Sequence, residues 1–306
     1  MRTPIIIDTD PGIDDVIAIT AAAFSEKLEV GLITTVAGNV DINRTTKNAI
    51  DLIDFLEKDI PVVRGMANPL LKPLVTASYV HGDSGIGGYS FESDGSHLLN
   101  KNENAVIEMR KYILNSSEPV TLVPIGPLTN IATLLRLFPE VKENIKKIVL
   151  MGGASEGGNY TPVAEFNIFV DPHAAKIVFD EEIDIVMCGL DVTRATSVNF
   201  EEIKEIKSYG KVGKMISEML MYYSAHYSKK ELIIHDLCTI FYLTNPEMFT
   251  VKNAKVDVVT NGAAEGCTIT HFTEKGNVKV CLNADRKMFT DQFIKVFKNI
   301  DEKGMS

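Results

Sequence analysis

The chain lacks several patterns that mark other classes of protein. Its four cysteines form no C-x-x-C pair and have no histidine at zinc-finger spacing, which excludes the common structural zinc motifs. No apolar run approaches the ~20 residues that a membrane-spanning helix needs. Basic residues number 31 against 41 acidic ones, for a net charge of −10, which opposes a surface that binds nucleic acid.

These absences predict a soluble protein of the cytoplasm that binds neither membranes nor nucleic acid. Cys188, Cys238, Cys267 and Cys281 are expected to be reduced and mostly buried. The first apolar run begins at residue 5 and leaves no room for a signal peptide. A hydrophobic content of 45% is ordinary for a chain that buries a core.

The first two thirds of the chain alternate between apolar runs of strand length and helical patterns. Strands are predicted at 4–8, 29–36, 120–125, 147–151 and 184–189. Helices are predicted at 13–25, 43–57, 102–115, 127–137, 172–181, 200–208 and 211–226. Gly126-Pro127 and Asp171-Pro172 are predicted helix starts, with proline in the first helical position. This alternation indicates parallel strands joined by right-handed crossovers.

The last third has a different pattern. Residues 251–259, 266–271 and 277–282 are three predicted strands with short connections, followed by an amphipathic helix at 285–299. We therefore predict one α/β domain over residues 1–306: an open, mostly parallel, Rossmann-like sheet flanked by helices, with added antiparallel strands near the C-terminus. The long irregular stretch 76–101 is expected to form part of the rim of a site.

An acidic cluster stands where the first strand turns into a helix. Asp8 and Asp10 are two apart on an extended segment and so point the same way, while Asp14 and Asp15 open the helix at its positive end. Crowded carboxylates raise one another's pKa or recruit a cation. Because open α/β sheets bind ligands at the carboxyl ends of strands, the cluster indicates a divalent-metal site at the mouth of an active site.

Two simpler interpretations explain the cluster less well. Helix capping accounts for Asp14 and Asp15 but leaves the two carboxylates before the turn unexplained. An EF-hand loop that began at Asp8 would need glycine where Ile13 stands and glutamate where Ile19 stands.

A third alternative is a Mg²⁺-dependent phosphatase of the haloacid dehalogenase type, with Asp8 as the nucleophile. The Asp8-Thr9-Asp10 segment fits the start of that pattern. The later acidic pair of such phosphatases has no convincing counterpart, and Asp14-Asp15 is surplus to it. Phosphate release from a nucleotide, without free base, would favour this alternative.

An ordered set of motifs between residue 5 and about residue 245 carries a more specific resemblance. The chain resembles the inosine-uridine-preferring nucleoside hydrolases. The segments that carry the resemblance are Asp8-Thr9-Asp10-Pro11-Gly12-Ile13-Asp14-Asp15, Val36-Ala37-Gly38-Asn39, Pro124-Ile125-Gly126-Pro127-Leu128-Thr129-Asn130, Met151-Gly152-Gly153, Asn159, Glu165-Phe166-Asn167, Asp171-Pro172 and His235-Asp236.

The resemblance implies Ca²⁺-dependent hydrolysis of the N-glycosidic bond of ribonucleosides to ribose and free base. By position, the ligands of Ca²⁺ would be Asp10, Asp15, Asp236 and the main-chain carbonyl of Ile125. Such an all-oxygen shell suits Ca²⁺ better than Mg²⁺, which demands tight octahedral geometry. Asp10, beside the attacking water, would be the general base. Asp8 is expected to support these ligands rather than to touch the metal.

The same resemblance assigns the ribose hydroxyls to five polar residues. They are Asp14, Asn39, Asn159, Glu165 and Asn167. Glu165 and Asn167 are two apart and are expected to share one face of an extended segment. Without the resemblance, this pair would also fit a solvated strand, and Asn39 would fit a plain turn.

The departing base is the remaining part of the expected site. His235 would protonate it, while the neighbouring Asp236, which alone would be taken for a helix N-cap, reaches the metal and substrate. By the resemblance, His81, Tyr223 and Tyr227 would close over the base in a pocket of pyrimidine-leaning or broad specificity. From the sequence alone, Tyr223 and Tyr227 also fit core packing, and His81 fits a loop residue without a role. The absence of tryptophan counts against the branch of the family that stacks purines between tryptophans.

A non-catalytic nucleoside- or ribose-binding protein is the alternative from another class, and binding of ribose without turnover would support it. The resemblance further implies a role in purine and pyrimidine nucleoside salvage and assembly into a homotetramer or homodimer.

Overall fold

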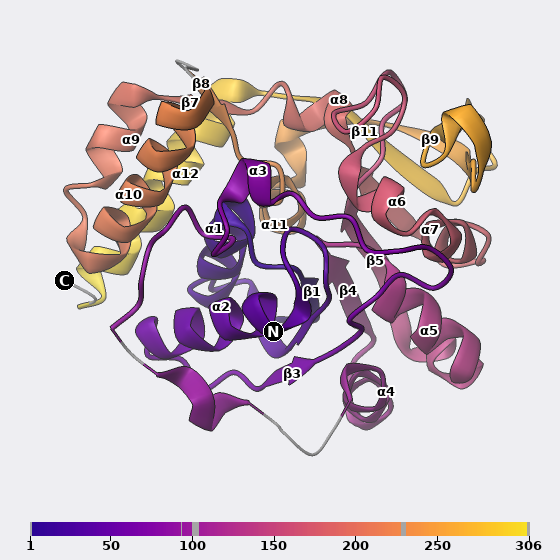
Figure 1. The fold of residues 1–306 in the computed structure, drawn as a ribbon, viewed down its shortest axis with the longest axis horizontal. Coiled ribbons are helices and arrows are strands. Elements are labelled where there is room, and N and C mark those ends of the chain that lie inside the picture. The colour runs from indigo at the N-terminus through magenta and orange to yellow at the C-terminus, as the bar shows by residue number, and fades with distance from the viewer. Residues whose placement is uncertain (1, 93, 100–103, 228–230, 305–306) are drawn as a thin grey trace.

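A computed structural model describes residues 2–92, 94–99, 104–227 and 231–304, without the side chains of residues 226 and 227. Within these ranges a nine-stranded sheet runs through the molecule in the order β10-β9-β11-β6-β5-β4-β1-β2-β3 (Figure 1). Its strands are β1 Thr3–Thr9, β2 Leu28–Thr35, β3 Val62–Arg64, β4 Val120–Pro124, β5 Ile145–Met151, β6 Ile185–Cys188, β9 Phe249–Val258, β10 Thr268–Phe272 and β11 Val278–Ala284.

The sheet has the predicted mixed character. Strands β1 to β6 pair in parallel, and β11 continues this arrangement beside β6. Strand β9 is antiparallel to both β11 and β10. The predicted fold class, a mostly parallel sheet with antiparallel additions near the C-terminus, is therefore confirmed.

The order of the first six strands locates the site. Read from the other edge, the sheet begins β3-β2-β1-β4-β5-β6, so the strand order reverses between β1 and β4. In doubly wound sheets a ligand crevice forms at this reversal, outside the carboxyl ends of the strands. The acidic cluster follows β1, and Ile125 follows β4, so both lie at this point.

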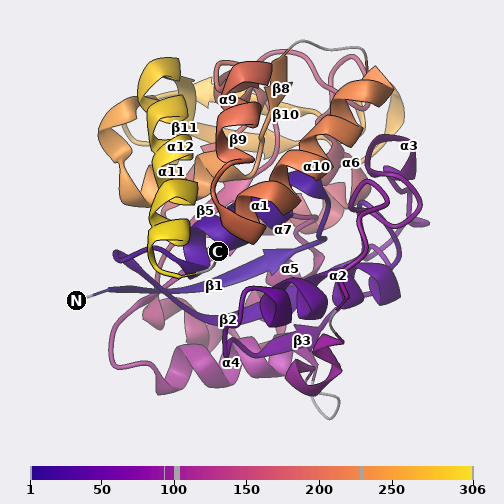
Figure 2. The ribbon, with the colours of Figure 1, turned by 90° about the vertical axis from the view of Figure 1, so that its left-hand side faces the viewer.

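Helices cover both faces of the sheet. The main helices are α1 Ile13–Ala23, α2 Ile42–Phe55, α4 Ala105–Asn115, α5 Thr129–Leu137, α7 Pro172–Phe179, α9 Phe200–Ile206, α10 Gly210–Tyr227, α11 Leu237–Thr244 and α12 Arg286–Glu302. Figure 2 shows α10 and α12 on one side of β1 and α4 on the other.

The apolar run of β1 explains this two-sided cover. Ile5 and Ile7 pack into the core on the side of α1 and α12, while Ile6 packs into the core on the side of α4 and α5. All three side chains are 0% exposed, as expected for a parallel strand buried on both faces. Full burial of each side chain contributes about 1.5–3 kcal/mol.

Short elements complete the structure and were not predicted. They are β7 Ser197–Asn199, β8 Glu231–Ile233, α3 Ser78–His81, α6 Phe166–Val170, α8 Leu190–Thr193, and the 3-10 turns η1 Gly95–Leu98, η2 Pro139–Asn144, η3 Pro246–Met248 and η4 Gly262–Ala264. Each has six residues or fewer, too few for a hydrophobic period to show in the sequence. Strand β3 was also missed, and helix α11 was absent from the predicted helices, although Asp236 alone fitted a helix N-cap.

One predicted helix start is wrong and another is confirmed. Helix α7 begins at Pro172, and the Asp171 side chain caps it by accepting from the Ala174 amide. Helix α5 begins at Thr129, two residues after Pro127, and Leu128 occupies its N-cap. The first residues of the helix predicted at 102–115 lie outside the described ranges.

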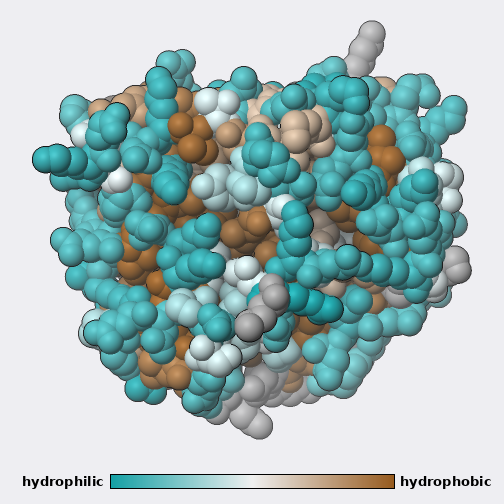
Figure 3. Space-filling model, turned by 180° about the vertical axis from the view of Figure 1, so that it is seen from behind, coloured by the Kyte–Doolittle hydropathy of each residue, from teal (hydrophilic) through white to brown (hydrophobic). Residues whose placement is uncertain are grey.

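The described part of the chain contains no helix long and apolar enough to cross a membrane. Its cysteines are unpaired, and Cys188, Cys238 and Cys281 are buried as predicted. The side of the molecule facing away from the view of Figure 1 is largely hydrophilic, with apolar residues in small separate groups (Figure 3).

Candidate active site

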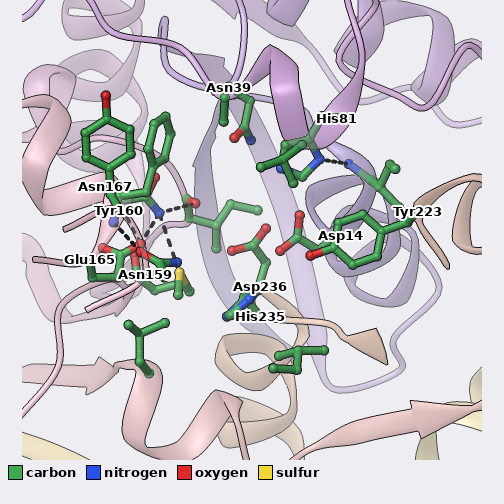
Figure 4. Close-up of a pocket in the computed structure, with 18 of the residues that line it drawn as sticks. Asp14, Asn39, His81, Asn159, Tyr160, Glu165, Asn167, Tyr223, His235 and Asp236 are labelled. Carbon is green, nitrogen blue, oxygen red and sulfur yellow. Dashed lines mark hydrogen bonds between the residues drawn. The ribbon is translucent and has the colours of Figure 1, made fainter. Parts of the chain in front are cut away.

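A cavity of about 310 Å³ opens at the carboxyl ends of the central strands. Its walls come from segments far apart in the sequence: the turns after β1, β2, β4 and β5, together with α3, α8, α10 and the segment before α11. Most of the predicted site residues line it. They are Ile125 and, labelled in Figure 4, Asp14, Asn39, His81, Asn159, Glu165, Asn167, Tyr223, His235 and Asp236.

Three predicted site residues do not appear in this lining. Asp10 and Asp15 lie beneath it, with exposed fractions of 0% and 1%. Tyr227 is the last residue of α10, and its side chain lies outside the described residues.

Carboxylates from both ends of the chain meet at the cavity. Asp14, Asp15 and Asp236 each offer an oxygen atom, and these atoms all lie within 4.8 Å of one another. Burial, followed by the charges of Asp14, Asp15 and Asp10, raises the pKa of Asp236 well above its ordinary value. The compact group thus contains Asp14, and Asp10 adjoins it, whereas the predicted ligand set contained Asp10 without Asp14.

Among the described residues, no lysine or arginine charge acts on the pKa values of this cluster. Burial raises the pKa of Asp14 to about 6, and burial together with the charge of Asp14 raises that of Asp15 to about 6. Burial and the charge of Asp15 raise the pKa of Asp10 well above the ordinary value. Buried carboxylates are ionised at neutral pH when a cation is paired with them, so the group has the chemistry of a divalent-cation site.

Asp10 supplies a more specific indication. Its Oδ2 accepts from the amide of Asn39 at 2.6 Å, whereas its buried Oδ1 has no hydrogen-bond partner among the described residues. A Cβ atom on Gly126 would lie 2.5 Å from this Oδ1, so glycine lets the chain after Ile125 pass close to it. An unpaired buried oxygen beside a main-chain turn fits a position that receives a cation.

The other two acidic residues are held differently. Asp15 accepts from the Thr9 hydroxyl at 2.6 Å and the Gly12 amide at 2.9 Å, so it also stabilises the start of α1. Asp236 occupies the N-cap position of α11, yet its side chain makes no capping hydrogen bond. Its carboxylate is therefore directed to the cluster rather than to the helix.

Asp8 has a structural place behind the cavity. Its Oδ1 accepts from the Thr34 hydroxyl at 2.5 Å and from Asn130 Nδ2 at 2.7 Å. The side chain is 0% exposed, and burial raises its pKa to about 7. A nucleophile for a phosphate would have to reach the cavity, so these contacts argue against the phosphatase alternative.

The wall beside β5 is organised by α6, and here the sequence prediction is wrong. Glu165 and Asn167 do not share an extended segment: Glu165 caps α6 by accepting from the amides of Asn167 and Ile168, and Asn167 lies in its first turn. The side-chain Nδ2 of Asn167 donates to the Ile125 carbonyl at 3.0 Å. Asn159 Oδ1 accepts from the Phe166 amide at 2.9 Å, so these polar residues fix one another (Figure 4).

The opposite wall carries the two histidines. His81 accepts from the Ile13 amide through Nδ1 at 3.2 Å, and a Cβ atom on Gly12 would lie 2.8 Å from that nitrogen. Burial lowers the pKa of His81 to about 4, which keeps the ring neutral. Its ring stacks near Tyr223 with centroids 6.4 Å apart. His235 Nδ1 lies 2.9 Å from the Thr193 hydroxyl.

Several residues that shape the cavity were missed from the sequence. Tyr79, Tyr160, Phe166, Leu190 and Arg194 line it. The signal available for Leu190 and Arg194 was their position just after the predicted strand 184–189, at a strand end where α/β sheets place functional residues. Tyr79 lies in α3, within the stretch 76–101 that the sequence predicted for the rim, whereas Tyr160 lies in an irregular segment and carried no such signal.

Known proteins share this sequence and this fold. The family model described as inosine-uridine preferring nucleoside hydrolase matches residues 5–291. The non-specific ribonucleoside hydrolase RihC of Salmonella newport is 45% identical over 298 residues, which cover 96% of this chain and 97% of the relative. A similar relative, again at 45% identity over 298 residues, is RihC of Salmonella typhimurium.

Solved structures agree with the sequence matches. The purine-preferring ribonucleoside hydrolase from Gardnerella vaginalis superposes with a TM-score of 0.92 at 30% identity, covering 99% of this chain and all of the other. A plant nucleoside hydrolase, PpNRh1, superposes with a TM-score of 0.90 at 28% identity, covering 97% of this chain and 99% of its own. The chain therefore belongs to the inosine-uridine preferring nucleoside hydrolase family, and it is a nucleoside hydrolase.

Proposed function

We propose that this enzyme releases free base and ribose from both purine and pyrimidine ribonucleosides, with Ca²⁺ as its cofactor, Asp10 as general base and His235 as general acid. The observation that carries the proposal is the convergence of Asp14, Asp15 and Asp236 within 4.8 Å at the cavity, beside the unpaired Oδ1 of Asp10. Hydrolysis of an N-glycosidic bond needs an activated water, a held sugar and a protonated leaving group. Asp10 and the cation would activate the water, the polar residues of the cavity would hold the sugar, and His235 would protonate the leaving group.

Asp10, Asp15, Asp236 and the Ile125 carbonyl are the groups proposed to hold Ca²⁺. All four are oxygen donors, and their number and mixed type favour Ca²⁺ over Mg²⁺. When bound, the cation would supply a positive charge that lowers the pKa of water and attracts the ribose hydroxyls. The Asn167 side chain, which donates to the Ile125 carbonyl, would keep that oxygen directed at the site.

Asp14, Asn39, Asn159, Glu165 and Asn167 are proposed to bind the ribose hydroxyls. Apart from Asn159, their side chains are at least partly buried, and Glu165 and Asn167 are held by α6. Preformed polar contacts hold C1′ of the sugar where a water can attack it, which lowers the entropic part of the barrier.

The proposed reaction consumes one water. Asp10 accepts a proton from the water while the water oxygen bonds to C1′, and the C1′–N bond breaks with its electron pair left on the base. His235 gives a proton to that base nitrogen. Solvent then carries the proton of Asp10 back to His235, so nucleoside and water become ribose and neutral base.

Broad base specificity is proposed for two reasons. Relatives at 45% identity are named non-specific ribonucleoside hydrolases, whereas the Gardnerella enzyme at 30% identity is named purine-preferring. The base wall carries His81 and Tyr223 as polar aromatic groups, which suit pyrimidines and purines alike. A preference for pyrimidines stays a prediction.

A panel of ribonucleosides, assayed for free base with and without a chelator, tests the proposal. We expect release of base from inosine, uridine and cytidine, and loss of release with the chelator. Phosphate release from nucleotides without free base would support the phosphatase alternative. Calorimetric binding of ribose without any turnover would support a non-catalytic binding protein.

Four further features are proposed. A single domain over residues 1–306 and a cytoplasmic location rest on the sequence pattern, whereas a role in nucleoside salvage and assembly into a homotetramer or homodimer rest on the resemblance to the family. Light scattering on the purified chain tests the assembly.

A further inference from the structure

Helix α8, Leu190–Thr193, connects the two walls of the cavity. The Asp191 carboxylate accepts from the amide and the hydroxyl of Ser155, each at 2.7 Å. Arg194, the C-cap, donates to the Gly158 carbonyl at 2.7 Å. Thr193 faces the other way and contacts His235. The helix thus joins the loop that carries Asn159 to the residue proposed to protonate the base.

The contact of Thr193 is buried and specific. The side chain is 0% exposed, and its Oγ1 lies 2.9 Å from His235 Nδ1. Within the described residues, this hydroxyl makes no other hydrogen bond, in contrast with Thr20 and Thr46, whose hydroxyls donate to carbonyls of their own helices. The backbone geometry of α8 therefore leaves the Thr193 hydroxyl to the histidine.

Orientation of the His235 ring matters for the proposed reaction. The residue lies on the short connection between β8 and α11, where regular structure does not fix the two side-chain torsions. His235 lines the cavity, so once Nδ1 is held by Thr193, Nε2 is the nitrogen that meets a nucleobase. When His235 gives its Nε2 proton to the base, Nδ1 keeps its own proton, so the Thr193 hydroxyl can accept from Nδ1–H before and after the transfer.

We propose that Thr193 is a positioning residue for the hydrolysis: its buried hydroxyl holds Nδ1 of His235 and thereby directs Nε2 at the departing base. This inference rests on the proposed role of His235 and adds a residue that acts through it. Misplacing a catalytic group by about 1 Å costs roughly 100-fold in rate, so loss of the hydroxyl should be visible in kcat.

Thr193→Val is the decisive variant because valine keeps the shape of threonine and removes the hydroxyl. We expect kcat for uridine to fall roughly 100-fold, with KM little changed. The rate with p-nitrophenyl riboside, whose leaving group needs no proton, should stay near that of the parent enzyme. Thr193→Ser, which restores the hydroxyl, should recover most of the uridine rate. Equal losses on both substrates, or no rescue by serine, would overturn the proposal.

Two further variants separate this role from a general disturbance. Thr196→Val removes another buried hydroxyl near α8, one that donates to the Thr193 carbonyl, and should leave the ratio of the two substrate rates unchanged. In a His235→Ala background, Thr193→Val should cause no additional loss on uridine. An additional loss there would show that Thr193 acts independently of His235 and would overturn the proposal.

The outcomes also separate this inference from the proposed function. If the parent enzyme releases no base from any ribonucleoside, the proposed function fails. If His235→Ala slows uridine selectively and Thr193→Val does not, only the role of Thr193 fails. If Thr193→Val is unfolded by circular dichroism, the rate ratio of Thr193→Ala on the two substrates decides between the same two outcomes.

Discussion

The floor of the cavity and its rim are built in different ways. The floor is the turn from β1 into α1 with Asp10, Asp14 and Asp15, and it follows directly from a strand buried on both faces. The rim consists of α3, α6, α8 and residues 233–236, all short pieces held by side-chain contacts to distant segments. The sheet therefore fixes the geometry of the floor, whereas individual hydrogen bonds fix the geometry of the rim.

The largest effect is expected on the floor. Asp10→Asn keeps the shape of the side chain and removes the charge that accepts a proton from water. We expect kcat to fall by at least about 1,000-fold on uridine and on p-nitrophenyl riboside alike, because both reactions need the activated water. Asp8→Asn is the matched control, since Asp8 is equally buried but accepts hydrogen bonds from Thr34 and Asn130 and is proposed neither to bind the cation nor to activate the water. Near-normal turnover by Asp10→Asn would refute its role.

On the rim, a smaller and selective effect is expected. His235→Ala should slow uridine by roughly 100-fold, the usual contribution of one general acid. The p-nitrophenyl riboside rate should change little, because its leaving group departs without a proton. The ratio of the two rates is the measurement. If both rates fell together, His235 would be a residue that positions the substrate rather than an acid.

A third change tests the rim as a hydrogen-bonded structure. Glu165→Gln places an amide where a carboxylate accepts from the amides of Gly153, Asn167 and Ile168. We expect the free energy of unfolding to fall by about 1–2 kcal/mol and KM for uridine to rise about tenfold. Glu202→Gln changes the side chain that accepts from the Asn199 amide in the capping box of α9, away from the cavity, and should not change KM. A rise in KM for both variants would show that the effect is not local.

A further effect, on stability rather than on rate, is a pH dependence expected on the floor. Burial raises the pKa of Asp14 and Asp15 to about 6, so the folded metal-free protein binds protons more tightly than the unfolded chain does. Its stability should therefore fall as the pH rises from about 4 through about 6. A bound cation opposes this loss of stability because it pairs with the ionised carboxylates.

Thermal unfolding measures this dependence. We expect the rise in Tm on adding calcium to be larger at about pH 8 than at about pH 5, because protons compete with the cation at the lower value. A calcium-dependent rise of equal size at both pH values would contradict the proposed cluster.

The sequence was sufficient for the floor because its signals are local. A buried apolar run, a proline-glycine turn and four nearby carboxylates lie within Ile5–Asp15, and the structure places this segment at the reversal of strand order. Alternation of strands and helices likewise predicted the parallel sheet, because each period spans enough residues to be visible.

The rim could not be predicted in the same detail because its geometry depends on contacts between distant residues. The extended interpretation of Glu165 and Asn167 failed because α6 has only five residues and depends on a cap that accepts its first amides. Thr193 and His235 are 42 positions apart in the sequence, and nothing in the two residue types predicts that they make contact. The resemblance to the family named most of the polar residues that line the cavity, but it did not include this support.

Calcium binding tests the central claim most directly, namely that carboxylates from both ends of the chain hold one cation on which base release depends. The protein is stripped with a chelator, freed of it, and titrated with calcium by calorimetry while uracil release from uridine is assayed in the same samples. The account predicts one calcium per chain, with activity restored in proportion to the bound fraction, and loss of both in Asp236→Asn. Full uracil release by stripped protein that binds no calcium would contradict it.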